Sequence, residues 1–435
     1  MLPKTVPPLG AYTPTNSAFL EGRDAPDGPV RERIDVLDVL RGIALLGMFV
    51  VHFSYYTLYR SPAVPGTPPI GMSTLSHVID WVFEGRFYTL FGMLFGVGFA
   101  IQLDRADARG DHFVVRYLRR MATLAVFGFI AEGIFGYNVL FGYALWGIPL
   151  LLVRRWSTRS LIVLLALCAA SPQVWDLGRI ALATARPGGV EQIAVADSAR
   201  NARFAAARAA LDSADESPSW RTIIAARMRF MVRFHRRWST LPRGSFTLFL
   251  IGLIAFRLGL FDRPEQHRRL IVALMAGGAV SWIISTWVLP VGGPVAPLRS
   301  GHAPVLQAAI TMARTNAFLL LRTDWLAFVY AGAVLLLVAN NRAWLHRLAP
   351  FAWTGRVALT CYMLQVIFLD LTFSKRGLDV PLSPLAVPLW AAALFAVQAL
   401  GARWWLQRYQ FGPLEWVWRS ATYWRVQPMR RVASA

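Results

Sequence analysis

Residues 37–52 read LDVLRGIALLGMFVVH, with Asp38 and Arg41 near one end of an otherwise apolar stretch and His52 at the other. The apolar character continues to about residue 59. A helix needs roughly 20 mostly apolar residues to cross a bilayer. This stretch therefore predicts a membrane-spanning helix over residues 37–59.

The same pattern recurs along the 435 residues of the chain. Further apolar segments of spanning character lie at 78–103, 118–135, 139–153, 160–177, 243–261, 269–289, 324–340, 355–373 and 384–407. Apolar residues make up 56% of the chain and charged residues only 16%, with a mean hydropathy of +0.44; soluble domains carry roughly 25% charged residues. The sequence predicts an all-α fold, a polytopic transmembrane bundle of about ten spanning helices.

The net charge of +21 is explained better by membrane topology than by nucleic acid. The basic residues lie in short clusters between apolar runs, and no groove-reading motif accompanies them. Five arginines follow the second predicted span within a short loop and the start of the next segment: Arg105, Arg109, Arg116, Arg119 and Arg120. The positive-inside rule makes this loop cytoplasmic. We expect both termini in the cytoplasm and a bacterial inner-membrane location.

Composition divides the chain into five parts. Residues 1–33 are rich in proline and polar residues, without the apolar core of a signal peptide, and predict a disordered cytoplasmic tail. Residues 34–177 and 243–410 form two transmembrane halves, separated by an extramembrane or interfacial insert at 178–242. Residues 411–435 predict an interfacial C-terminal helix and tail, because tryptophans and arginines mix there.

The insert contains one amphipathic helical pattern. Ile224, Met228 and Met231 follow helical spacing, and Arg221 and Arg229 fall on the other face. This pattern is typical of a helix that lies in the membrane interface. Counting spans places the insert outside the cell despite its arginines, but loops of about 60 residues escape the charge rule, so its side stays open.

The first span offers two chemically active groups on one helix. Arg41 and His52 are separated by eleven residues, or roughly 16 Å along a helix. Ionisable residues inside a bilayer usually face a cavity or the bundle interior, and imidazole is suited to proton abstraction near neutral pH. The structural alternative is that Arg41 only anchors the helix beside Asp38, while His52 bonds a neighbouring helix.

The spacing of Arg41 and His52 resembles the first helix of the integral-membrane acyltransferases that acetylate polysaccharides. Three other stretches resemble the bacterial YeiB-like family (domain of unknown function 418), which is related to heparan-alpha-glucosaminide N-acetyltransferase. They are FYTLFGMLFG at 87–96, GRVALTCYMLQ at 355–365 and FGPLEWVWR at 411–419. The resemblance covers nearly the whole chain outside its tails.

The resemblance implies an acyltransferase fold in which acyl-coenzyme A enters from the cytoplasm and a polar acceptor from outside. Arg41 and Arg356 are the candidates for binding the donor's phosphates, and His52 is the candidate general base. One departure concerns the junction of the third and fourth helices, where Glu132 and Asn138 replace the histidine and aspartate that are usual in the family. Glu132 is a candidate partner of His52, and Asn138 or Tyr143 could donate a hydrogen bond to the acyl oxygen.

The leading hypothesis is transfer of an acetyl-like group from acyl-coenzyme A (acetyl-coenzyme A) to a hydroxyl or amine of an extracytoplasmic or membrane-bound acceptor, without a metal. The alternative is a non-catalytic member of the fold, either a transporter or a structural subunit of a larger membrane complex. The expected partners of the protein are the lipid bilayer, the acyl donor and the polar acceptor, and no nucleic acid is expected. The sequence does not decide whether the protein forms a homo-oligomer, nor does it identify the acceptor or the acyl chain.

Overall fold

The computed structural model of the protein describes residues 29–58, 78–79, 81–110, 112–136, 139–238, 244–284, 325–380 and 386–431. This part of the chain is helical, with one isolated β-bridge between Tyr409 and Arg430. The fold is therefore all-α over the described residues. Residues 1–28 of the predicted tail at 1–33 lie outside them, as does the site candidate Asn138.

The helices of the first half and the insert are α1 (Pro29–Leu58), α3 (Arg86–Asp107), α4 (Phe113–Phe135), α5 (Leu140–Gly147), α6 (Leu150–Val153), α7 (Thr158–Thr184), α8 (Gly189–Asp215) and α9 (Trp220–Trp238). Those of the second half are α10 (Ser245–Arg257), α11 (Arg268–Ile283), α13 (Leu326–Asn340), α14 (Ala343–Arg347), α15 (Ala349–Arg356), α16 (Ala358–Phe373), α17 (Val387–Arg408) and α18 (Pro413–Tyr423). Each of the ten predicted spans overlaps at least one of these helices.

Three of the described helices are by themselves long and apolar enough to cross a membrane: α1 over Asp35–Ser54, α3 and α17. Two bent pairs raise this number to five if each pair is one span. One is α7, which bends by 44°, and the other is α15 with α16, which meet at 86°. Shorter apolar helices lie at Leu140–Val153, Ser245–Arg257 and Leu326–Asn340.

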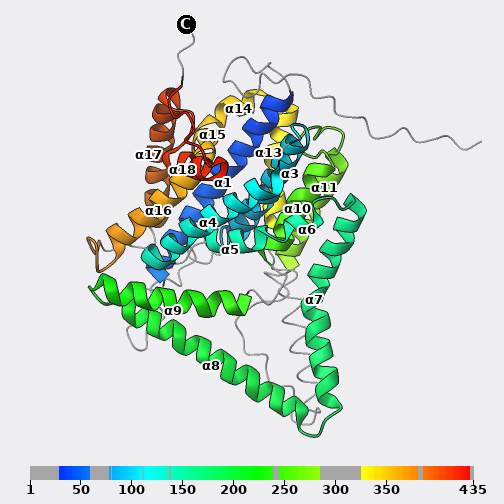
Figure 1. Ribbon diagram of the computed structural model, residues 1–435, viewed down its shortest axis with the longest axis vertical. Coiled ribbons are helices and arrows are strands. Elements are labelled where there is room, and N and C mark those ends of the chain that lie inside the picture. The colour runs from blue at the N-terminus through cyan, green and yellow to red at the C-terminus, as the bar shows by residue number, and fades with distance from the viewer. Residues whose placement is uncertain are drawn as a thin grey trace, which may run out of the picture.

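Helix α1 lies at the centre of the bundle and packs against α3, α15, α16 and α17 (Figure 1). Its crossing with α15 is close because both helices carry glycine at the contact. A Cβ atom on Gly42 would overlap the carbonyl of Phe351, and one on Gly355 would overlap the carbonyl of Asp38. Small residues let the backbones of membrane helices approach in this way.

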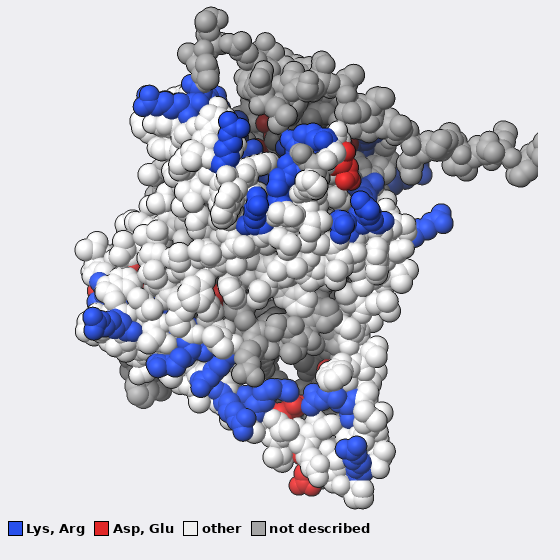
Figure 2. Space-filling model, in the orientation of Figure 1, with Lys and Arg blue, Asp and Glu red and all other residues white. Residues whose placement is uncertain are grey.

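The insert extends away from the bundle and returns to it. Figure 1 shows α7 running out to a corner, α8 leading back, and α9 lying between α8 and the base of the bundle, where it packs against α4 and α8. Figure 2 shows arginine and lysine side chains in two bands, one toward the top and one along α8 and α9. A belt of mostly uncharged residues, with a few acidic side chains, separates the two bands, as expected for a surface that faces lipid between two aqueous layers.

Candidate active site

Arg41 and Arg356 lie together where α15 crosses α1. Arg41 Nη1 donates a hydrogen bond to Asp38 Oδ1 at 2.5 Å, and the Asp38 side chain is buried. Arg356, which directly follows Gly355, also acts electrostatically on Asp38. The glycine contacts that bring the helices close thus place two arginines around one buried carboxylate.

Three further arginines extend this group into an arginine cluster, defined as Arg41, Arg120, Arg356, Arg419 and Arg431. Arg120 is within electrostatic range of Arg41 and Arg419, and Arg431 is within range of Arg356. Burial lowers the pKa of Arg431 and that of Arg419 below their usual values, and the charge of Arg356 adds to the effect at Arg431. Closely spaced like charges of this kind favour a bound anion, and guanidinium groups match phosphate geometry.

Helix α18 holds part of this cluster in place. Trp418 Nε1 donates to the carbonyl of Arg120 at 2.9 Å, and the Arg120 guanidinium stacks over the Trp418 ring at 3.6 Å. Glu415 on the same helix accepts hydrogen bonds from the backbone N–H groups of Leu359, at 2.6 Å, and Thr360, at 3.0 Å. Glu415 thereby caps the N-terminus of α16, where backbone donors have no partner inside the helix.

His52 lies further along α1, toward the opposite end of the bundle. Its ring meets the ring of Tyr362 on α16 edge-on, with the centroids 5.8 Å apart. Its Nδ1 atom is buried and makes no hydrogen bond to the described residues. One turn after Tyr362, the fully buried Gln365 donates to Gln398 Oε1 at 2.9 Å. Polar groups from α1, α16 and α17 are therefore present in this half of the bundle.

Two of the remaining candidates, Glu132 and Tyr143, lie on α4 and α5. Glu132 is buried near the C-terminal end of α4. Tyr143 on α5 is fully buried, and its hydroxyl donates to the carbonyl of Tyr88 at 2.9 Å. Asn138, as noted, is not described. The structure thus brings Arg41 and Arg356 together around Asp38, while the ring of His52 contacts Tyr362 and the hydroxyl of Tyr143 bonds to Tyr88.

A largely buried network of charged side chains joins the insert to the bundle. Arg227 of α9 donates to Asp370 Oδ1 of α16 at 3.0 Å, and also to the carbonyl of Ile134 at the end of α4. Arg376 donates to Asp215 Oδ1 at 2.8 Å and reaches Asp370 Oδ1 at 3.4 Å. The side chains of Asp370 and Arg376 have no exposed surface. The network therefore fixes α8 and α9 against the ends of α4 and α16.

The sequence did not lead us to predict this network, although the position of Arg227 in α9 indicated it. The amphipathic pattern of the insert placed Arg221 and Arg229 opposite the apolar residues and assigned no role to Arg227 and no partner to Asp370. Arg227, however, lies among the buried positions Ile223, Ala226 and Met231. An arginine on the apolar face of an amphipathic helix indicates a buried acidic partner, because an unpaired buried charge is very costly.

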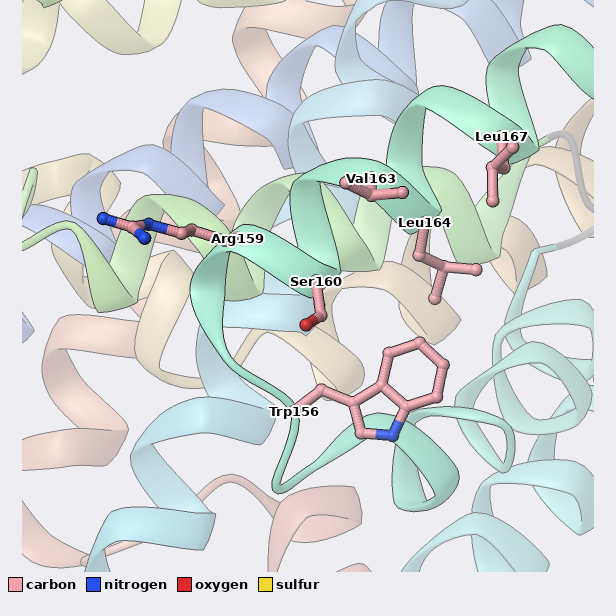
Figure 3. Close-up of a pocket in the computed structure, with 6 residues that line it drawn as sticks. All are labelled: Trp156, Arg159, Ser160, Val163, Leu164 and Leu167. Atoms are coloured by element: carbon pink, nitrogen blue, oxygen red, sulfur yellow. The ribbon is translucent and has the colours of Figure 1, made fainter.

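A surface pocket of about 380 Å³ lies apart from these residues, at the start of α7. It is lined by Trp156, Arg159, Ser160, Val163, Leu164 and Leu167. In Figure 3 the guanidinium of Arg159 points away from the apolar side chains, so the pocket presents mainly hydrocarbon. None of the predicted site residues lines it.

Comparison with known proteins divides the chain into two matched regions. Residues 33–186 match the family model described as "Heparan-alpha-glucosaminide N-acetyltransferase, catalytic". Residues 255–425 match the model described as "Protein of unknown function (DUF418)". His52, Arg41 and Glu132 lie in the first region and Arg356 in the second.

Similar proteins align over nearly the full length. The uncharacterized protein YxaH of Bacillus subtilis (strain 168) is 28% identical over 417 residues, covering 92% of this chain and 96% of the relative. The uncharacterized protein YeiB of Escherichia coli (strain K12) is 28% identical over 432 residues, covering 90% and 96%. No solved structure matches the chain. The chain is therefore similar to YxaH and YeiB over nearly its full length, and its second half matches the domain of unknown function 418.

Proposed function

We propose that this protein is an integral-membrane acyltransferase of the bacterial inner membrane. It moves an acetyl-like group from acyl-coenzyme A to a hydroxyl or amine of an extracytoplasmic or membrane-bound acceptor. The donor's phosphates bind at the arginine cluster, and the acceptor approaches His52 from the opposite side. The match of residues 33–186 to a catalytic N-acetyltransferase model supports this reaction class.

The single observation that carries the proposal is the arrangement along α1. One helix holds Arg41 in a cluster of five arginines. Roughly 16 Å further on, it holds an imidazole with a buried nitrogen that bonds to none of the described residues. A donor with a polyanionic head and a reactive group at the end of a long arm fits this separation. The phosphates can then remain at the cytoplasmic face while the thioester reaches into the bundle.

The reaction requires one proton transfer and one acyl transfer. The imidazole of His52 accepts the proton of the acceptor hydroxyl or amine as its oxygen or nitrogen attacks the thioester carbonyl. The resulting tetrahedral intermediate collapses, the carbon–sulfur bond breaks, and the coenzyme A thiolate leaves. Proton return from the imidazolium to the thiolate completes the cycle and needs no metal.

The membrane arrangement is part of the same proposal. The five candidate spans become about ten when the three shorter apolar helices, α4 and α11 are added. The arginine cluster then lies on the cytoplasmic side with both termini, following the positive-inside rule. The helices shorter than 18 residues would cross the bilayer only where the protein and snorkelling side chains thin it locally.

The role of His52 is tested by acyl transfer in membranes that contain the native acceptor. Membranes from producing cells are incubated with acetyl-coenzyme A labelled in the acetyl group, and label is measured in membrane and extracytoplasmic material. The variant His52→Gln keeps a polar side chain of similar reach but cannot act as a base. We expect its transfer rate to fall by roughly 100-fold or more, the usual contribution of general-base catalysis.

The variant Tyr362→Phe provides the matched control, because it keeps the ring that packs against His52. It should fold like the wild type, which a melting curve in detergent verifies for both variants. Full transfer activity in folded His52→Gln protein would exclude the histidine as the base. Absence of any transfer by the wild type above membranes lacking the protein would contradict the proposed reaction.

A further inference from the structure

Helix α9 presents a row of arginines that the fold does not use. Its 19 residues, Trp220–Trp238, include no Asp, Glu, Asn or Gln. Arg221, Arg229 and Arg233 are exposed, and none of them forms an ion pair with the described part of the chain. Among the described residues, no acidic side chain therefore compensates the positive charge on the outer face of α9.

The opposite face of α9 is fixed to the bundle. Ile223, Ala226 and Met231 are buried, and Arg227 is bound by Asp370 and the carbonyl of Ile134. These contacts lie at the C-terminal ends of α4 and α16, whereas the arginine cluster lies toward their N-terminal ends. Helix α9 is thus an anchored, basic surface at the end of the bundle opposite the proposed donor site.

Apolar side chains flank the exposed arginines. Val232 is 54% exposed, and Phe230 and Phe234 stack on each other while remaining partly accessible. The lower band of basic side chains in Figure 2 runs beside the belt of mostly uncharged surface. A surface that offers guanidinium groups next to exposed hydrocarbon suits a ligand with a phosphate and acyl chains better than a soluble anion.

We infer that the outer face of α9, through Arg221, Arg229 and Arg233, binds the headgroup phosphates of anionic phospholipids in the adjacent leaflet. Guanidinium groups bind phosphate oxygens bidentately, and each basic residue near an anionic bilayer surface adds to the attraction. Because Arg227 links this helix to Asp370, bound lipid would hold α9 in its docked position. The inference does not depend on the proposed acyl transfer.

The test measures retention of lipid by the purified full-length protein in a neutral detergent. Short-chain phosphatidylglycerol and phosphatidylcholine are titrated separately, and bound lipid is counted by native mass spectrometry. The variant Arg221→Gln/Arg229→Gln/Arg233→Gln should bind phosphatidylglycerol at least tenfold more weakly than the wild type. Binding of phosphatidylcholine, which has no net charge, should be weak in both proteins.

The matched control removes three arginines from the neighbouring helix, in the variant Arg200→Gln/Arg203→Gln/Arg208→Gln. Two of these are already paired, Arg200 with Asp197 and Arg208 with Asp212, so this variant should retain phosphatidylglycerol. Equal retention by the wild type and the α9 variant would overturn the inference. Displacement of the lipid by an equal concentration of soluble glycerol phosphate would also overturn it, since the site would then recognise a free phosphate.

Discussion

At the scale of single residues, Asp370 is the most consequential charge in the described chain. Its carboxylate is fully buried and is bound by Arg227 and Arg376, which come from different parts of the sequence. Buried ion pairs contribute little compared with apolar packing, but removing one partner leaves a charge that water cannot reach. The network should therefore be costly to break.

The variant Asp370→Ala should lose about 3–5 kcal/mol of stability, because two buried guanidinium groups lose an anionic partner. Thermal unfolding in detergent measures the change. The control is Asp212→Ala, which removes an aspartate from an exposed pair with Arg208 on α8; such pairs contribute at most about 1 kcal/mol. Similar losses in the two variants would show that the Asp370 network is not an anchor.

The sequence revealed candidate residues better than it revealed their partners. Arg41 and His52 stand out because each interrupts an apolar run. The pairing of Arg227 with Asp370 could not be read from the sequence, since 143 residues separate them and the partner of a buried charge depends on tertiary packing. A family resemblance suggested that Arg41 and Arg356 share one binding site. The roles of Gly42 and Gly355, which let α1 and α15 approach closely, become visible only in the structure.

At the scale of elements, apolar runs predicted where helices occur but not how they bend or pair. The predicted span at 355–373 is one continuous run, yet the chain turns by 86° between α15 and α16. The turn exposes the first N–H groups of α16, and Glu415 accepts hydrogen bonds from two of them. The pattern of apolar residues cannot predict such a turn, because the residues on both sides of the turn are equally apolar.

The cap predicts a pH dependence of stability. Burial raises the pKa of Glu415 above its usual value, while hydrogen bonds from Leu359 and Thr360 partly offset that effect. When the pKa of a carboxyl is higher in the folded than in the unfolded state, its contribution to stability is full at pH values below the unfolded pKa, about 4.3. That contribution is lost as the pH rises through the pKa of the folded state. The variant Glu415→Gln cannot ionise, so wild-type stability relative to the variant should fall as pH rises from 4.

Melting curves of both proteins between pH 4 and pH 8 measure this difference. Subtracting the curve of Glu415→Gln removes the contribution of the other titrating groups that both proteins share. A difference that stays constant over this range, or that grows with pH, would mean that the carboxyl is not destabilised by burial.

At the scale of the whole molecule, the two ends of the bundle have distinct chemistry. One end carries the arginine cluster, held by α15 and α18, and the other carries α9 and its buried anchor. The mostly uncharged belt in Figure 2 separates them. Composition and charge patterning predicted basic clusters separated by apolar spans. They did not predict which end of the bundle the insert packs against, because the arginines of the insert are compatible with either side of the membrane.

The most direct test is the sidedness of donor binding. Labelled acetyl-coenzyme A is added to sealed inverted and sealed right-side-out membrane vesicles that contain the wild type or the variant Arg41→Gln/Arg356→Gln. We predict saturable binding to inverted vesicles with the wild type, its loss in the variant, and no binding to right-side-out vesicles until they are permeabilised. Binding that is absent from wild-type inverted vesicles, or that the double variant retains in full, would contradict the account.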